Sequence, residues 1–250
     1  MNEHTAPSNG PRDGDVATWD NGALIRVRDL TRVYHQGTLE VHALRGVNLD
    51  VGEGEFTALS GPSGSGKTTL LNIIGVLDHP TSGSVKVDGV DVSTMNRGEA
   101  ADFRLATAGF IFQAYNLVPV LTAYENAEFT LMLKGVSRSE RRDRVVPLLE
   151  RVGLAGMMDR KPHELSGGQQ QRVAIVRALA TEPKIILADE PTANLDSETS
   201  AELLDLMLEL NRDLNTTFLF STHDPVVIER ARRVLKLLDG RVADSVGQAA

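Results

Sequence analysis

The chain has 250 residues, of which 41% are hydrophobic and 24% are charged, so it is long enough for one large domain with a substantial core. Its formal net charge of −8 argues against a large nucleic-acid surface, because such surfaces depend on lysine and arginine. It contains no cysteine, which excludes disulfides and thiol chemistry, and no apolar run is long enough to cross a bilayer.

The first part of the chain is predicted to be a disordered tail followed by a small antiparallel sheet. Residues 1–22 are rich in Asn, Asp, Gly, Pro and Thr, show no hydrophobic periodicity and include the only tryptophan, Trp19. Residues 246–250 are expected to be frayed, so a single domain would cover residues 23–245. Strands of the small sheet are expected at Leu24–Arg28, Gly46–Val51 and Val85–Gly89.

Residues 61–68 read Gly-Pro-Ser-Gly-Ser-Gly-Lys-Thr and fit the phosphate-loop pattern G-x-x-x-x-G-K-[ST]. A buried strand is expected before the loop, at residues 55–60. The glycines let main-chain N–H groups approach a phosphate, and the following helix adds its positive end. We expect Lys67 to reach the β- and γ-phosphates and Thr68 to bind Mg²⁺. A glycine-rich turn before a core helix would not explain eight matching residues. The helix is predicted from apolar positions at Leu70, Leu71, Ile74 and Leu77.

Two later apolar runs are predicted to be buried parallel strands that end in polar side chains. Residues 184–188 lead into Asp189 and Glu190, and residues 217–221 lead toward His223. Ligands bind at the carboxyl edge of open α/β sheets, so Asp189 could hold Mg²⁺ and Glu190 could polarise the attacking water as a general base. His223 could hydrogen-bond the γ-phosphate. On its own, an acid pair or a single histidine would more often be structural.

The segment between residues 113 and 165 is predicted to be helical. Ser137–Glu140 fits a capping box at the start of one helix. Pro147 interrupts this helix and should kink or divide it. Its apolar positions are Val145, Leu148, Leu149 and Val152.

Two more helices and one more strand are expected around the remaining motifs. Ser166 should cap a helix over residues 169–180, and Asp196–Ser197 should cap another. A strand at residues 108–112 is expected to join the parallel sheet. The buried side of the last helix is predicted to hold Leu203, Leu204, Met207, Leu208 and Leu214.

Together these segments resemble the ATP-binding-cassette (ABC) ATPases over roughly residues 23–245. The resemblance implies an α/β fold with a RecA-like phosphate-loop NTPase core, a small antiparallel β subdomain and a helical subdomain at about residues 114–164. Its most specific part is the LSGGQ signature, which other phosphate-loop NTPases lack. Besides the phosphate loop, the matching segments are the glutamine loop at Gln113, the signature Leu165–Gln169, the Walker B strand Ile185–Glu190, the D-loop Ala193–Asp196 and the switch histidine His223.

The resemblance implies that ATP and Mg²⁺ are bound between two copies of the chain, with the signature of one copy facing the γ-phosphate held by the other. The implied catalytic residues are Glu190, His223, Lys67 and Gln113, and the implied metal ligands are Thr68, Gln113 and Asp189. Tyr34 lies where the family has an aromatic residue that stacks on adenine; alternatively, it is a strand tyrosine packed on the small sheet. The other implied nucleotide-binding residues are Gly61, Ser63, Gly64, Ser65, Gly66, Lys67, Thr68, Thr69, Ser166, Gly167, Gly168, Gln169 and Asp196.

The resemblance also implies a partner, a separate integral membrane permease, which would hold the chain on the cytoplasmic side of the membrane. Tyr115–Pro119, the triple glutamine after the signature and Asp189–Asp196 are similar to the lipoprotein-releasing, macrolide-export and cell-division ATPases. In that branch the permease has four spans and a large extracytoplasmic domain. Tyr115–Pro119 and Leu121–Tyr124 would form a docking groove, or part of them would be subdomain core.

A rival class is a soluble ABC ATPase without a transporter, acting in cell division, DNA repair or translation. Such proteins typically carry long coiled-coil insertions or two fused cassettes. This chain shows one cassette, no such insertion and an acidic net charge, so no nucleic acid is expected as a partner.

Overall fold

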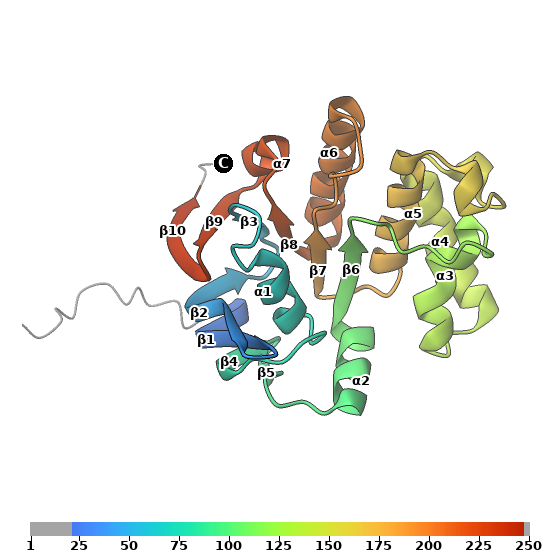
Figure 1. Ribbon diagram of the computed structural model, residues 1–250. Coiled ribbons are helices and arrows are strands. Elements are labelled where there is room, and N and C mark those ends of the chain that lie inside the picture. Colours follow the sequence, from blue (N-terminus) through green and yellow to red (C-terminus); the bar gives the residue numbers. More distant parts are fainter. Residues whose placement is uncertain (1–21, 248–250) are drawn as a thin grey trace, which may run out of the picture.

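The computed structural model describes residues 22–247, which form two sheets and a group of helices (Figure 1). The predicted tail at residues 1–22, including Trp19, lies outside the described residues except for Gly22, and so do residues 248–250. The predicted α/β fold class, with its small antiparallel sheet and its helical part, is confirmed.

The larger sheet has six strands in the order β10-β9-β3-β8-β7-β6, and all neighbouring strands are parallel except the edge pair β9–β10. All four predicted strands of this sheet are present. The outer strands β9 and β10 were not predicted, and β10 includes Val246 and Gly247, which were expected to be frayed. The strands are β3 (Phe56–Ser60), β6 (Ala108–Phe112), β7 (Ile185–Asp189), β8 (Thr217–Thr222), β9 (Arg233–Leu238) and β10 (Arg241–Gly247).

Helices and the small sheet cover the two faces of this sheet, and the alternation of side chains along the strands decides which face each residue joins. Leu59 and Leu219 pack on the side of α1 (Lys67–Ile74) and the small sheet. Phe56, Phe218 and Phe220 pack on the side of α6 (Ser197–Leu214) and α7 (Pro225–Arg230). Because both faces of the sheet are buried, successive residues in each strand are apolar and not alternately apolar and polar.

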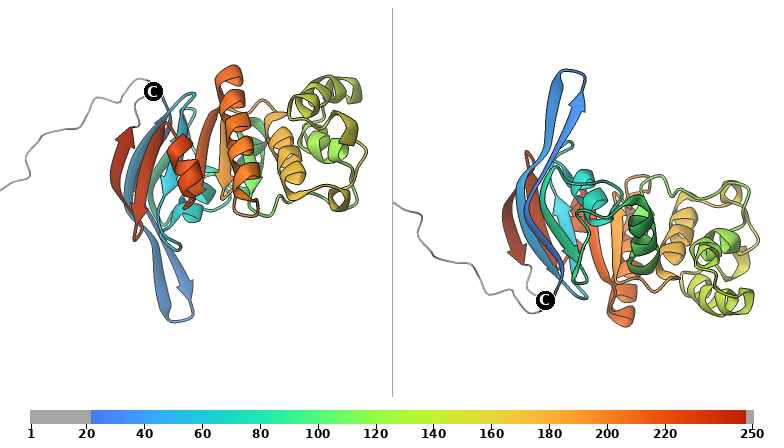
Figure 2. Two further views of the ribbon diagram at one scale, coloured as in Figure 1. Left: turned by 90° about the horizontal axis from the view of Figure 1, so that it is seen from above. Right: turned by 90° about the horizontal axis from the view of Figure 1, so that it is seen from below.

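The small sheet is dominated by a long hairpin of β1 (Ala23–Gln36) and β2 (Leu39–Gly52), which projects from the body in Figure 2. The sheet continues with β4 (Ser82–Val87) and β5 (Val90–Asp91) in the order β2-β1-β4-β5. The predicted strands cover only the inner half of the hairpin. The outer half was not predicted because it packs on no core: Leu39 is 61% exposed at its tip.

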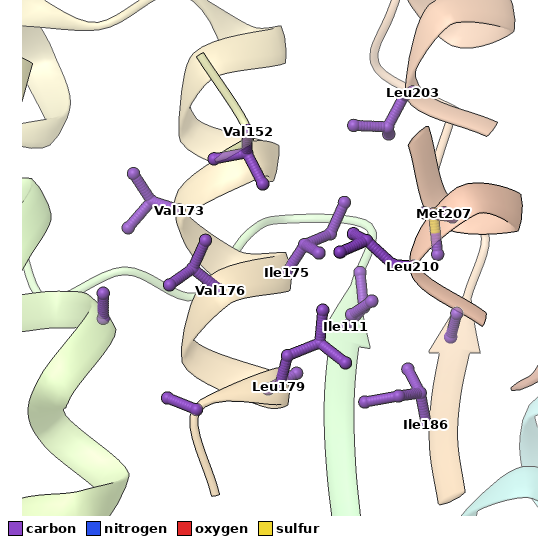
Figure 3. Packing of buried hydrophobic residues seen from close by; sticks show 14 of the residues in the cluster. Ile111, Val152, Val173, Ile175, Val176, Leu179, Ile186, Leu203, Met207 and Leu210 are labelled. Atoms are coloured by element: carbon purple, nitrogen blue, oxygen red, sulfur yellow. The ribbon is translucent and has the colours of Figure 1, made fainter. Parts of the chain in front are cut away.

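The helical subdomain consists of α3 (Ala123–Leu133), α4 (Arg138–Arg151) and α5 (Gly167–Leu179), with 3₁₀ turns at Ala155–Met157 and Pro162–Glu164. Helix α5 packs against both α3 and β6, so it joins the other helices to the larger sheet. Figure 3 shows Val173 and Val176 of α5 pointing away from the sheet, whereas Ile175 and Leu179 point toward Ile111 of β6. Helix α2 (Arg97–Thr107) leads into β6.

Pro147 does not divide its helix, because α4 runs without interruption from Arg138 to Arg151. Pro147 faces solvent while Val145 and Leu149 on the other side are fully buried, and this packing holds the helix together. The predicted capping box is only half formed. Ser137 accepts a bond from the Glu140 N–H, but the Glu140 carboxylate pairs with Arg144 at 2.6 Å instead of returning to Ser137.

Two positions that were predicted to be buried, Leu77 and Leu214, are exposed because each lies at or beyond the end of its helix. Leu77 lies beyond the end of α1 and is 46% exposed. Leu214, the last residue of α6, is 44% exposed, and Leu210 is buried instead. Leu203, Leu204 and Met207 are buried as predicted, and Leu208 is partly buried.

Replacing Pro147 with alanine should stabilise the protein. Alanine restores one helical N–H donor and removes the ring clash within α4, which together cost up to about 3 kcal/mol in a helix interior. We expect the free energy of unfolding, measured with urea, to rise by about 1–3 kcal/mol. Pro119→Ala, at an exposed turn, is the matched control and should give no gain. Equal effects of the two substitutions would contradict this account of α4.

Candidate active site

The three strands β3, β8 and β7 lie side by side, and their carboxyl ends meet at one edge of the sheet. In the β-ladder, Ser60 pairs with Thr222 and Ser221 pairs with Asp189. The loops that follow these strands therefore leave the sheet at the same level, with the loop after β8 in the middle. This register brings together the phosphate loop, the Asp189–Glu190 pair and His223, which lie far apart in the sequence.

The phosphate loop folds tightly after β3 and depends on glycine at two points. A Cβ on Gly61 would lie 2.1 Å from the Leu237 carbonyl oxygen. Gly66 has a φ of 103° and caps the start of α1, where a Cβ would lie 2.5 Å from the Ala43 carbonyl oxygen. Gly64 also has a positive φ, of 80°, but its Cβ would point into open space.

Helix α1 begins without a side-chain cap, whereas the six other α-helices of the described region all have one. The first N–H groups of any helix have no partner within the helix, so the start of α1 is free to bind an anion. Ser65 provides a second group that is suited to an anion. Its side chain is 3% exposed, and its Oγ has no hydrogen-bond partner among the described residues. Both features fit a phosphate group.

Lys67, the first residue of α1, folds back over the loop. Its Nζ donates to the carbonyl oxygens of Gly61 at 2.8 Å and Pro62 at 3.1 Å. The side chain is 7% exposed, and no described carboxylate forms an ion pair with it. The loop therefore holds a positive charge that neutral carbonyls solvate but do not neutralise.

Thr68 and Asp189, two of the three predicted metal ligands, meet at the sheet edge. Thr68 Oγ1 donates to the two carboxylate oxygens of Asp189 at 3.0 and 3.2 Å. Ser221 Oγ also donates to Asp189. Hydroxyl and carboxylate oxygens are the ligands that Mg²⁺ prefers, so this group fits the ion. Ser221 was not predicted, although its place at the end of an apolar strand beside Asp189 could have indicated it.

Gln113, the third predicted metal ligand, is not joined to this group in the structure. It follows β6, and its side chain is exposed. Its main-chain carbonyl accepts a hydrogen bond from the amide of Asn194 in the D-loop, at 2.8 Å. The structure therefore ties the glutamine loop to the D-loop, a contact that the sequence did not predict.

Glu190 and His223 form a hydrogen-bonded pair, with 2.7 Å between Glu190 Oε1 and His223 Nδ1. The Glu190 carboxyl is largely buried, at 17% exposure, while His223 is 70% exposed. Glu190 has a positive φ of 47°, and its N–H donates to the Ser221 carbonyl at 3.0 Å. The main chain thus turns sharply after β7 and aims the carboxylate along the sheet edge.

The signature motif forms the start of α5, as predicted. Ser166 accepts from the Gln169 N–H at 3.3 Å, and the Gln169 side chain accepts from the Ser166 N–H at 3.0 Å, which makes a complete capping box. The motif lies apart from the phosphate loop: in Figures 1 and 2, α1 and α5 lie on opposite sides of strands β7 and β6. One chain therefore does not bring its own signature to its own phosphate loop.

Asp196, predicted to contact nucleotide, caps helix α6 in this structure. The Thr199 N–H and Oγ1 donate to its two carboxylate oxygens at 2.8 and 2.7 Å. These two hydrogen bonds hold the pKa of the Asp196 carboxyl below its ordinary value, because they favour the charged form. Asp196 is exposed, and its capping partner Thr199 lies beside Gly168 of the signature, where a Cβ would be 2.6 Å from Thr199 Cγ2.

Tyr34 is anchored on the small sheet by two neighbours. Its Oη donates to Asp78 at 2.7 Å, and the Arg32 guanidinium lies 4.4 Å from the centre of its ring. Arg32 also pairs with Asp78 at 2.7 Å. The ring is held in one orientation and stays partly exposed.

A groove of about 460 Å³ opens between α2, β6 and α3, away from the phosphate loop. Leu77 and Leu133 lie at its margin and are 46% and 59% exposed. Of the two predicted docking segments, only Asn116 lines this groove. Leu117 and Tyr124 pack against the core of the helical subdomain, and Val120 is strongly exposed. The groove is lined mainly by Leu77, Arg104, Phe110, Phe112, Asn116, Phe129, Leu133 and Arg177.

Comparison with known proteins identifies the family of this fold and site. The family model described as "ABC transporter" matches residues 44–193. An uncharacterised ABC transporter ATP-binding protein of Thermotoga maritima is 47% identical over 88% of this chain and 93% of its own length. The macrolide export ATP-binding/permease protein MacB of Brucella melitensis is 46% identical over 88% of this chain but only 34% of its own length. This chain thus spans about a third of the macrolide-export relatives that it matches.

Solved structures agree with this assignment. A dimeric ATP-binding cassette in a post-hydrolysis state, bound to ADP and Pi, is 43% identical to this chain with a TM-score of 0.83. The alignment covers 90% of this chain and 99% of that one. Within residues 22–247, none of the helices combines the length and the apolar character that a membrane crossing requires. The chain belongs to the ABC transporter family, as one of its ATP-binding ATPase domains.

Proposed function

We propose that two copies of this chain close head to tail around two MgATP, hydrolyse them, and thereby drive a membrane permease. The separation of the phosphate loop from the signature within one chain carries this proposal. Each copy offers an uncapped helix start at α1 and a glycine-containing helix start at α5, and only a second copy can bring the two together (Figure 1). The dimeric arrangement of the 43% identical cassette supports this assembly.

The phosphate loop holds the nucleotide in this proposal. The free N–H groups at the start of α1, the unpaired Ser65 hydroxyl and the Lys67 ammonium would surround the β- and γ-phosphates. We assign Gly61, Ser63, Gly64, Gly66, Thr68 and Thr69 to the same cradle, Tyr34 to the adenine, and Ser166–Gln169 and Asp196 to contacts with the nucleotide of the opposite copy.

Thr68 and Asp189 would hold Mg²⁺, with Gln113 completing the ligands when the glutamine loop moves toward them. No cluster of three or more acidic or histidine side chains suited to a metal ion occurs in residues 22–247. That fits Mg²⁺, which usually takes one or two protein oxygens and completes its shell with phosphate and water. When bound, the ion offsets the negative charge of the phosphates.

Glu190 is placed to act as the general base and His223 to orient it. The carboxylate lies at the sheet edge beyond Asp189, on the side of the loop that follows β8. In this structure His223 bonds Glu190 directly, so one imidazole nitrogen remains for the γ-phosphate. Glu190 would accept the proton of the attacking water, and His223 would hold the carboxylate in that position.

The permease would dock in the groove between α2, β6 and α3 from the cytoplasmic side of the membrane. Apolar side chains at an exposed groove favour burial by a partner, and Phe112 and Asn116 on its wall flank the glutamine loop. The relatives named for macrolide export combine ATP-binding and permease parts, whereas the Thermotoga relative is named for ATP binding alone. We infer a separate four-span permease of the macrolide-export and lipoprotein-releasing type.

Lys67→Ala should weaken MgATP binding strongly. Removing the ammonium removes one or two charge-assisted bonds to phosphate, each contributing about 1.5–3 kcal/mol, so the Kd should rise at least about tenfold. Isothermal titration with MgATP measures this. Lys184→Ala, at an exposed lysine far from the loop, serves as the control and should bind like the wild type. Unchanged affinity in Lys67→Ala would refute the assignment of the phosphate loop.

Glu190→Gln should bind MgATP, lose about 10²–10⁴-fold in turnover and accumulate as a closed dimer. Size-exclusion chromatography with light scattering should show a monomer without nucleotide and a dimer with MgATP. Adding Ser166→Arg to Glu190→Gln should abolish the dimer, because a long cation would fill the anion site that each copy offers to the other. A Glu190→Gln protein that stays monomeric with saturating MgATP would contradict the sandwich.

Leu133→Asp should break permease docking. Tagged Glu190→Gln protein with MgATP should capture a four-span permease from detergent-solubilised native membranes, identified by mass spectrometry. The same protein with Leu133→Asp should not, since a carboxylate would enter the apolar groove. Leu39→Asp, at an equally exposed position on the β1–β2 hairpin, is the matched control and should retain capture. Recovery of ribosomal or DNA-bound proteins instead would favour the soluble ABC class.

A further inference from the structure

The loop between β6 and α3 contains two consecutive residues in the left-handed region. Tyr115 has a φ of 59° and Asn116 a φ of 50°. Left-handed backbone is unfavourable for residues with a Cβ and is kept only where neighbouring groups impose it. Because Gln113 lies just before this turn, whatever imposes the turn also sets the position of the glutamine.

Arg177, near the end of α5, holds this turn through hydrogen bonds to the main-chain carbonyls of the turn. Its Nη1 donates to the Asn116 carbonyl at 2.5 Å, and its Nη2 donates to the Tyr115 carbonyl at 2.8 Å. A planar guanidinium is suited to hold two neighbouring acceptors at once, whereas a lysine ammonium is not. The two left-handed residues are therefore clamped by one side chain.

The environment of Arg177 is unusual for an arginine. Burial lowers the pKa of its guanidinium, and no acidic side chain in the described part of the chain forms an ion pair with it. A desolvated charge without a counter-ion is costly, and main-chain carbonyls satisfy it only while the loop keeps this conformation. The clamp and the loop conformation therefore depend on each other.

Two further contacts fix the same loop to the signature and the D-loop. The Tyr115 hydroxyl lies against Gly167 at the start of α5, where a Cβ would be only 2.8 Å from it. The Asn194 amide donates to the Gln113 carbonyl. Helix α5 thus contacts the glutamine loop at both ends of the helix, through Gly167 at its start and through Arg177 near its end.

Arg177 and Asn116 also line the groove between α2, β6 and α3. Any group that enters the groove meets the same guanidinium that clamps the loop. This position gives Arg177 contact with both the groove and the glutamine loop.

We propose that Arg177 is a positioning residue, which fixes the main chain of Tyr115 and Asn116 and thereby places Gln113 for hydrolysis. This inference rests on the proposed ATPase function. Arg177 itself does not touch the nucleotide. Losing the clamp should therefore slow turnover without weakening the binding of MgATP.

Steady-state ATPase kinetics of the purified full chain test whether Arg177 places Gln113 for hydrolysis. Arg177→Met should lower kcat by about 10- to 100-fold, as expected when a reacting group is misplaced by about 1 Å, and leave KM for ATP nearly unchanged. Arg177→Lys keeps a donor and should recover part of kcat. Arg141→Met is the matched control. Arg141 also donates a hydrogen bond to a main-chain carbonyl, that of Val136, but it contacts no part of the glutamine loop.

A spectroscopic measurement tests the clamp without relying on activity. The chain has three tyrosines, so 3-fluorotyrosine labelling gives three ¹⁹F resonances that single Tyr→Phe variants assign. Arg177→Met should shift or broaden the Tyr115 resonance and leave that of Tyr34 unchanged. Arg141→Met should leave the Tyr115 resonance in place. If Arg177→Met fails to fold, Arg177→Lys provides the same comparison.

An unchanged Tyr115 resonance, or an equal loss of kcat in Arg141→Met, would overturn the positioning role. A parallel rise in KM would overturn it too, because it would place Arg177 in nucleotide binding. If the wild-type chain hydrolysed no ATP, the proposed function would fail, while the ¹⁹F spectra would still decide whether Arg177 fixes the loop.

Discussion

The parallel register of β3, β8 and β7 is the constraint on which the site depends. Side chains alternate between the two faces of each strand, so a shift of one residue would move Phe218 and Phe220 from one buried face to the other. Packing on both faces therefore fixes the register, and the register places Thr68 within hydrogen-bonding distance of Asp189. The catalytic edge is therefore a consequence of how the core packs.

The parts of this structure that could be predicted from the sequence are those with a local signal. The phosphate loop, the signature and the buried parallel strands each carry their own pattern over 5–8 residues, and the fold class follows from them. Strands β9 and β10 escaped prediction because Lys236 and Asp244 interrupt their apolar pattern and no motif marks them. The predictions at Pro147 and Leu77 were wrong for the opposite reason, because local rules were applied there. Tertiary burial keeps α4 continuous through Pro147, and α1 ends before Leu77, with Gly75 as its C-cap.

For the site, the sequence placed the motif residues on the correct strands, loops and helices. Their roles in binding and catalysis stay predictions. What the sequence could not give is the set of contacts between motifs. Ser221 on Asp189, Asn194 on Gln113 and the arginine clamp are made by ordinary polar residues with no distinctive spacing. Such residues acquire meaning only once the fold brings separate segments together, so single-sequence reasoning finds the ligand-binding groups and misses what positions them.

The strained residues show where the fold opposes its own local preferences. Glu190, Tyr115 and Asn116 all adopt left-handed backbone conformations, at a cost of about 1–3 kcal/mol each. At Glu190 the conformation is held by a main-chain bond to β8 inside a rigid sheet. At Tyr115 and Asn116 the two main-chain carbonyls accept hydrogen bonds from the Arg177 side chain at the wall of a groove. A turn held by the sheet cannot move without the sheet, whereas a turn held by side-chain contacts can move when those contacts are lost. The glutamine loop is therefore the part of the catalytic edge that is best suited to respond to a partner.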